Sequence, residues 1–140
     1  MAYPDQKYYS RPLQLLAQAA SFGTSTAGDT VGHDLTDVYA GLPKFIRKSQ
    51  IKALRVRCTV IPDAGSTALV AHFLNGTDTM GTITLTTATA DQFFDVTLTA
   101  ANTIFAADGQ PTIKTTGTST ASGDAQGSYD IWAEIQELFV

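Results

Sequence analysis

Cys58 and the two histidines, His33 and His72, are the side chains in this sequence that could support nucleophilic catalysis. A catalytic thiol needs a histidine within hydrogen-bond reach, but Cys58 falls within an apolar alternation that is typical of a small core residue. The sequence contains no nucleophile elbow, phosphate-binding glycine loop or zinc-protease motif. Asp91 and Asp95 could form a carboxylate pair for glycoside hydrolysis, but no glutamate lies nearby, and we interpret both as surface residues. We therefore expect no enzymatic activity.

One loop is rich in possible metal ligands, namely Asp29, His33, Asp34 and Asp37. Loops rich in oxygen ligands can hold calcium, but this spacing does not match the twelve-residue calcium loop. Acidic residues in loops commonly cap turns, and we interpret these residues in that way. We expect no metal and no cofactor.

The basic residues are concentrated in one part of the chain. Residues 1–57 carry eight basic and four acidic side chains, a balance of +4, whereas residues 58–140 carry one basic and nine acidic side chains, a balance of −8. Such a bipolar molecule can orient itself against an oppositely charged partner or against copies of itself. The total of −4 is too acidic for a general nucleic-acid binder. Six of the nine basic residues are Lys44, Arg47, Lys48, Lys52, Arg55 and Arg57.

This basic stretch is either a solvated charged face or a contact with another protein. A nucleic-acid contact would need exposed aromatic side chains among the basic ones, and only Phe45 lies nearby. Arg55 and Arg57, two residues apart on a predicted strand, suit pairing with carboxylates of a partner or of a second copy. We predict a protein interface here, with the candidate residues Lys44, Phe45, Arg47, Lys48, Arg55 and Arg57.

Period-two alternation predicts a β-rich fold. In residues 51–61 the apolar positions fall on one face and the two arginines on the other. Further strands are expected at 67–74, 82–87, 93–99, 111–120 and 129–139, and the Asn-Gly pair in 75–78 favours a hairpin turn. Residues 13–21 fit a short helix or an extended segment almost equally well. The pattern predicts an all-β fold: an antiparallel β-sandwich or jelly roll of about eight strands over residues 46–140, preceded by an extended N-terminal arm over residues 1–45.

The segment 67–74 is apolar on both faces, so its second face needs a cover. Around a threefold axis, neighbouring copies would provide that cover and leave no open strand edge. We therefore predict a homotrimer, with Val70, His72 and Leu74 as further candidate interface residues. The predicted core consists of Leu54, Val56, Val60, Leu69, Phe73, Ile83, Leu85, Phe94, Val96, Leu98, Ile131 and Ile135.

Three features of the sequence bear on cellular location: the cysteine count, the N-terminal pattern and the length of the apolar runs. Cys58 is the only cysteine, so no intrachain disulfide can form. Residues 1–14 have no signal-peptide pattern, and no apolar run approaches the roughly 18 residues of a membrane span. We expect a protein made in the cytoplasm that does not contact a membrane.

The motifs together resemble a known family. The lead-in "PKFI", the basic strand "IKALRVRCTV", the Thr-Ala-Gly-rich hairpin "TALVAHFLNGTDTMGTITLTTATA" and the aromatic last strand "YDIWAEIQEL" are similar to those of small capsid decoration, or cement, proteins of tailed bacteriophages. The resemblance covers about residues 41–139. It implies a jelly-roll or β-sandwich structural protein of the virion. Such a protein binds the major capsid protein on the outer capsid surface as a trimer, without cofactor or catalytic residues.

An alternative is a carbohydrate-binding or lectin-like jelly-roll module, for example a head-fibre or tail-associated adhesion domain. Such modules present two or three exposed aromatic side chains. Trp132 alternates away from the core face of its predicted strand, so we expect it to be exposed. Tyr129 or Phe105 would have to join it to form a platform.

Overall fold

The computed structural model describes residues 13–22, 33–34, 38–63, 66–86, 88–119 and 125–138, and only the backbone at residues 33, 34, 66–68, 118 and 119. These residues form ten strands and one 3₁₀ turn, Ala100–Asn102. The strands are β1 (Gln14–Ser21), β2 (His33–Asp34), β3 (Val38–Tyr39), β4 (Ser49–Val60), β5 (Ser66–Asn75), β6 (Asp78–Thr84), β7 (Phe93–Asp95), β8 (Ile104–Phe105), β9 (Pro111–Ser119) and β10 (Ser128–Glu137).

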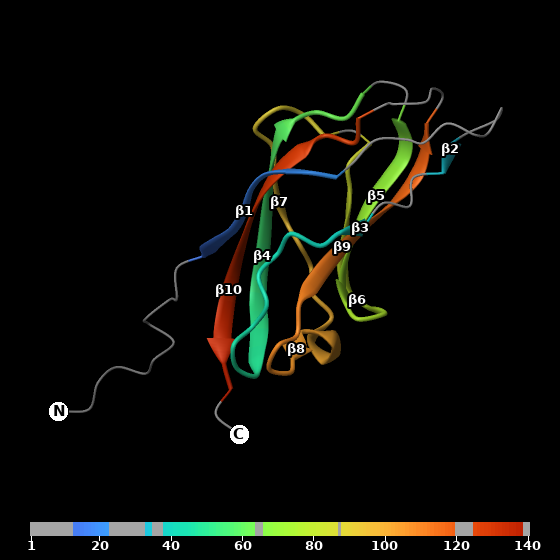
Figure 1. Cartoon of the computed structure of the whole chain (residues 1–140). Helices are drawn as coiled ribbons and strands as arrows, with labels where there is room; N and C mark the ends of the chain where they lie inside the picture. The colour runs from blue at the N-terminus through green and yellow to red at the C-terminus, as the bar shows by residue number, and fades with distance from the viewer. Residues whose placement is uncertain are drawn as a thin grey trace.

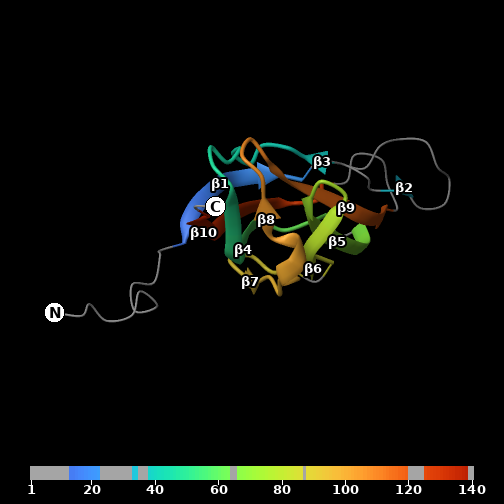
Figure 2. The same ribbon diagram turned by 90° about the horizontal axis from the view of Figure 1, so that it is seen from below.

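Two antiparallel sheets pack face to face, which confirms the predicted all-β sandwich. The first sheet has the order β1-β10-β4-β7, with β8 also paired to β4. The second has the order β2-β9-β5-β6, with β3 also paired to β9. Figure 1 shows β1, β10 and β4 in one layer and β9, β5 and β6 in the other, and Figure 2 shows the layers from one end. The chain crosses repeatedly between the two sheets, so that β1 pairs with β10 and β5 with both β6 and β9, and this strand order is that of a jelly roll.

The core lies between the two sheets, where the inward positions of each strand meet. Phe73 on β5 is almost fully buried and pairs with Gly81 on one side and Ile113 on the other. Eight of the twelve predicted core residues are buried: Leu54, Val56, Leu69, Phe73, Ile83, Leu85, Val96 and Ile131. Phe94, Leu98 and Ile135 are partly buried against the same core. Alternation therefore identified most of the inward positions.

Val60 is the predicted core residue that the structure places outside, with 56% of its surface exposed. Val60 pairs with Ser128 and Cys58 pairs with Tyr129, so β4 advances two residues where β10 advances one. This β-bulge breaks the alternation at the end of β4. A second irregularity beside Ile51 has the opposite consequence, because it places both Ile51 and Leu54, three residues apart, in the core.

The prediction of an extended N-terminal arm over residues 1–45 is wrong for the described parts of this segment, because they belong to the sandwich. Residues 14–21 form β1 and pair with β10, while β2 and β3 pair with β9. The apolar side chains of Ala20, Phe22 and Leu42 are buried in the core. The Phe22 ring stacks on Tyr129 with the ring centroids 4.4 Å apart. Hydrophobic burial thus ties this segment to the fold, and the remaining arm residues lie outside the described ones.

The predicted hairpin turn at 75–78 is present between β5 and β6. Asn75 pairs with Asp78, and Gly76 adopts a φ of 62°, which favours glycine. The connection between β7 and β8 contains the 3₁₀ turn Ala100–Asn102. Asn75 ties this connection to the hairpin by donating its side-chain N–H groups to the carbonyls of Asn102 and Ile104.

Alkaline pH should destabilise the fold through two buried groups that ionise. Burial, and secondly the charge of Asp91, raises the pKa of the Cys58 thiol. Burial, and secondly Cys58, raises the pKa of Tyr129 far above its usual range. The folded state favours the neutral forms, so their contribution to stability is complete below the unfolded pKa values, about 9 for Cys58 and about 10 for Tyr129. This contribution is lost as pH rises from those values through the raised pKa values of the folded state. Urea unfolding from pH 7 to 11 should show this decline, and Cys58→Ala should remove its first part. A flat profile would contradict the expectation.

Candidate functional site

The loop between β3 and β4 carries the first half of the basic stretch. We call residues 43–48 the tip loop. Its backbone is held firmly, because the Phe45 N–H donates to the Gly109 carbonyl at 2.9 Å and the Phe45 carbonyl accepts from the Asp108 N–H at 2.7 Å. The Phe45 ring is buried, with its centroid 5.0 Å from that of Phe105. Phe45 therefore anchors the tip loop from inside the core and does not present its ring to a partner.

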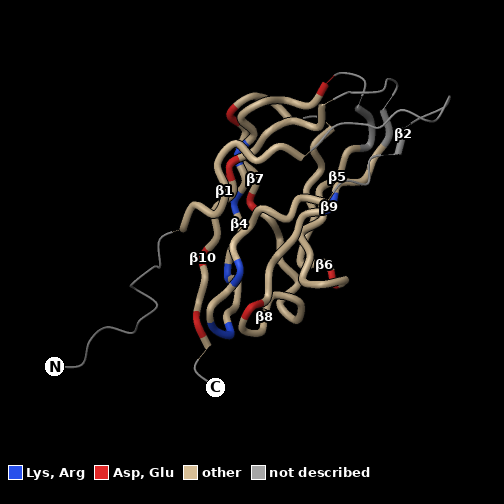
Figure 3. Tube along the Cα trace, in the orientation of Figure 1, with Lys and Arg blue, Asp and Glu red and all other residues tan. Residues whose placement is uncertain are grey.

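The exposed residues of the tip loop are one proline, one isoleucine and three cations. Ile46 is 88% exposed, the highest value among the exposed large apolar residues described. Lys44, Arg47 and Lys48 lie within two positions of it in the sequence and are also exposed. Within the described part of the chain, no ion pair involves these three cations. Figure 3 shows the basic positions at the lower end of β4, beside acidic positions at the end of β10 and near β8.

A groove of about 430 Å³ runs beside the tip loop. It is bordered by the loop, by β1 and by the end of β10, with Leu16 and Ile135 supplying apolar surface and Glu137 a carboxylate. The tip loop and this groove form a continuous surface of mixed apolar and charged character.

Arg55 and Arg57 lie on the outer face of the first sheet, as their alternation predicted. Their carboxylate partners, however, come from the same chain. Arg55 Nε lies 3.0 Å from Asp95 Oδ1, and Arg57 pairs with Asp91. Arg57 also approaches Asp130, at 3.9 Å. These two arginines therefore do not offer unpaired cations to a partner.

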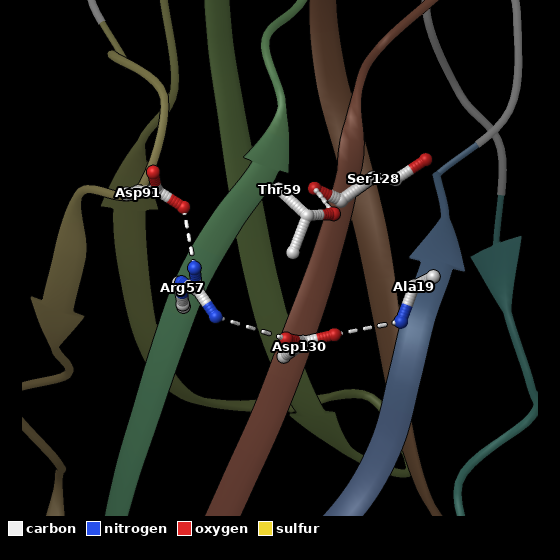
Figure 4. Close-up of polar contacts among 6 residues, drawn as sticks. All are labelled: Ala19, Arg57, Thr59, Asp91, Ser128 and Asp130. Atoms are coloured by element: carbon white, nitrogen blue, oxygen red, sulfur yellow. Dashed lines mark hydrogen bonds and ion pairs between the residues drawn. The ribbon is translucent and has the colours of Figure 1, made fainter.

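Asp130 connects this charge network to the edge strand β1. Its Oδ1 accepts a hydrogen bond from the Ala19 N–H at 2.8 Å, while its other oxygen faces Arg57. Ala19 has a φ of 50°, unusual for a residue other than glycine, and lies at a β1 irregularity opposite Asp130. Figure 4 shows the resulting chain of polar contacts from Asp91 through Arg57 and Asp130 to Ala19. The carboxylate holds the bulged strand against β10.

Replacing Asp130 by alanine should lower the free energy of unfolding by about 2 kcal/mol, because it removes a charged acceptor and leaves the Ala19 N–H without its partner. Asp95→Ala is the matched control, since Asp95 is 77% exposed and its ion pair with Arg55 should contribute less than about 1 kcal/mol. Urea denaturation of both variants tests the difference. Equal losses would mean that Asp130 does not hold β1 in place.

An aromatic pair lies next to the two arginines. The rings of Phe93 and Trp132 have centroids 6.1 Å apart, and Phe93 is half exposed. Tyr129 and Phe105, the residues considered from the sequence as companions of Trp132, are instead fully buried. The companion is Phe93, which comes from a strand that pairs with β4. Only the strand order could have identified it.

The outer face of the second sheet contains the other candidate interface residues. Val70, His72 and Leu74 are partly exposed and face away from the core, as predicted. His72 Nε2 lies 3.0 Å from Thr116 Oγ1 on the neighbouring strand. A shallow depression of about 340 Å³, lined in part by His72, Leu74 and Lys114, lies on this face.

The remaining chemical candidates are not brought together. Cys58, on β4 of the first sheet, is buried in the core between the sheets, whereas His72 lies on the outer face of the second sheet. Asp91 and Asp95 each pair with an arginine. The described residues contain no group of three or more histidine, cysteine or acidic residues that could hold a metal ion. Asp29 and Asp37 lie outside the described residues, and only the backbone is described at His33 and Asp34.

Comparisons with family models, with curated proteins and with solved structures each find no match for this chain. Among the described residues, no helix has the length and apolar character that crossing a membrane requires.

Proposed function

We propose that this protein is a structural component of a virion that binds the outer surface of a phage capsid and stabilises it, acting as a homotrimer. The observation that carries the proposal is the tip loop, where the highly exposed Ile46 stands among three cations that lack described ion-pair partners. An exposed apolar residue with three cations beside it in the sequence suits a contact with an acidic protein surface, in which Ile46 provides apolar burial and the cations provide orientation.

The way the tip loop is held supports a binding role. Its backbone is fixed by the hydrogen bonds of Phe45, and Ser49 donates its hydroxyl to the Arg47 carbonyl at 2.8 Å. A loop that is already ordered loses little conformational entropy when a partner binds. The buried ring of Phe45 serves the same purpose, because it fixes the backbone on which the exposed side chains stand.

The outer face of the second sheet supports the trimer. Val70, His72 and Leu74 leave apolar surface partly exposed beside a shallow depression. Copies arranged around a threefold axis would cover this surface and shield the sheet edges. The expected partners of this proposal are thus the major capsid protein, through the tip loop, and two further copies, through the second sheet.

Sedimentation tests the proposal directly. The purified protein should sediment as a trimer, and it should pellet with capsids of its phage and raise their resistance to heat. Duplex DNA at about 0.15 M salt should not bind, because the molecule is acidic overall. A strict monomer that pellets with no capsid would overturn the proposal, and so would stable binding to the duplex.

A further inference from the structure

The outer face of the first sheet carries a second surface, well separated along β4 from the tip loop. Phe93 and Trp132 form its aromatic part, and Arg55 and Arg57 lie beside them on β4. Strand register places Arg55 between Trp132 and Asp95, and Arg57 between Asp130 and Phe93. We call these residues, together with Asp91, the aromatic platform.

The aromatic platform is rigid before any ligand arrives. The guanidinium carbons of Arg55 and Arg57 lie 4.9 and 5.9 Å from the centre of the Phe93 ring, within the range of cation–π attraction. Asp95 and Asp91 form ion pairs with the two guanidinium groups. Phe93 nevertheless stays half exposed, so an ordered aromatic surface faces solvent. Ordering of this kind lowers the entropy cost of binding.

Charge on the aromatic platform argues against an ionic ligand. Its two arginines face three carboxylates, those of Asp91, Asp95 and Asp130, which leaves a formal charge of only −1. A polyanion would meet these carboxylates, and an acidic protein surface would find both guanidinium groups already paired. A cation would gain little from the Phe93 ring, because the two guanidinium groups already make its cation–π contacts. The surface therefore suits an uncharged ligand.

The polar groups of the platform match hydroxyl groups in particular. A hydroxyl both donates and accepts hydrogen bonds, and here carboxylate acceptors stand next to guanidinium donors. Asp91 and Asp95 are largely exposed, so their oxygens remain accessible to solvent. A pyranose ring has one apolar C–H face, which can stack on an aromatic ring, and hydroxyls around its rim. We propose that the aromatic platform binds a neutral saccharide, stacked on Phe93 and Trp132 and hydrogen-bonded by Asp95 and Arg55.

The only tryptophan of the chain, Trp132, provides a direct probe of this surface. Binding of the wild-type protein to an array of neutral, sialylated and sulfated glycans identifies the glycan that binds best. Titration of the best neutral glycan should then shift the tryptophan emission and saturate. Phe93→Ala should weaken this binding at least about tenfold, since an aromatic contact of this kind contributes about one logarithmic unit in affinity. Asp95→Asn should weaken it as well, by removing an anionic acceptor.

Ile104→Ala is the matched control, because Ile104 is another exposed large apolar residue, located on β8 away from the platform. It should leave glycan binding unchanged, and circular dichroism should confirm that all variants fold. The proposal is overturned if no neutral glycan binds, if acidic glycans bind more tightly, or if Phe93→Ala and Ile104→Ala bind equally well. Loss of capsid binding in Phe93→Ala, with no glycan binding in the wild type, would instead assign the platform to a protein contact.

Discussion

Replacing Phe73 by alanine is expected to lower the free energy of unfolding by about 3–5 kcal/mol. Phe73 is 1% exposed at the centre of β5, and its strand is paired on both sides, with β6 and with β9. Because the neighbouring strands hold the backbone in place, the core cannot collapse into the space that the ring leaves. The loss then combines the transfer free energy of the ring with the cost of the cavity. Urea denaturation with a two-state fit measures it.

Phe93→Ala is the control for this prediction, since it makes the same chemical change at a half-exposed position. Its cost should stay near 1 kcal/mol, because less apolar surface returns to water and no closed cavity forms. If Phe73→Ala and Phe93→Ala destabilised the protein equally, the face of β5 that contains Phe73 would not form the core.

Reversing the three cations of the tip loop, in the variant Lys44→Glu/Arg47→Glu/Lys48→Glu, should weaken capsid binding about a hundredfold. Each reversal replaces an attraction by a repulsion at an exposed contact, which we take as about 1 kcal/mol, so three cost about 3 kcal/mol. The fold should be unaffected, because these side chains are exposed and have no ion-pair partners among the described residues. Co-sedimentation with capsids over a range of protein concentrations measures the affinity.

Lys48→Glu and Lys52→Glu form a matched pair, since each changes the net charge equally and the two residues are close in sequence. Lys48 belongs to the tip loop, whereas Lys52 is an exposed residue within β4. Only Lys48→Glu should weaken binding, by about fivefold, and added salt should reduce the difference by screening the charges. Equal effects of the two variants would mean that capsid binding senses net charge and not the tip loop.

The structure also changes what reversal of Arg55 and Arg57 would test. Alternation alone suggests that this double change would leave the fold intact, since both side chains face outward. In the structure, however, they face Asp91, Asp95 and Asp130. Glutamates at these positions would gather five negative charges on one sheet face and would disturb the carboxylate that holds β1. Such a variant would report on stability as well as on binding.

The sequence by itself determined the fold class and most of the core, because side-chain alternation is a local property of each strand. It also located the turn at 75–78 through the Asn-Gly pair and the outward direction of Arg55 and of His72. For these features the information lies within a few consecutive residues, and the physical rule is simply that neighbouring side chains of a strand point to opposite faces.

Only the tertiary structure decided which side chains meet across strands. The exposure of Val60 depends on a bulge opposite Ser128, and the burial of Ile51 depends on another opposite Glu134 and Ile135. The pairing of Phe93 with Trp132 likewise follows from strand order, because residues 39 positions apart become neighbours when β7 and β10 both pair with β4.

Tertiary structure also decided which cations of the basic stretch have carboxylate partners. The six cations of residues 44–57 look equivalent in the sequence, yet Arg55 and Arg57 find carboxylates from β7, β10 and the loop before β7, whereas those of the tip loop find none among the described residues. Pairing depends on distance in space, and long-range strand pairing sets that distance. A local pattern can therefore predict where a charge points but not whether another charge of the same chain already neutralises it.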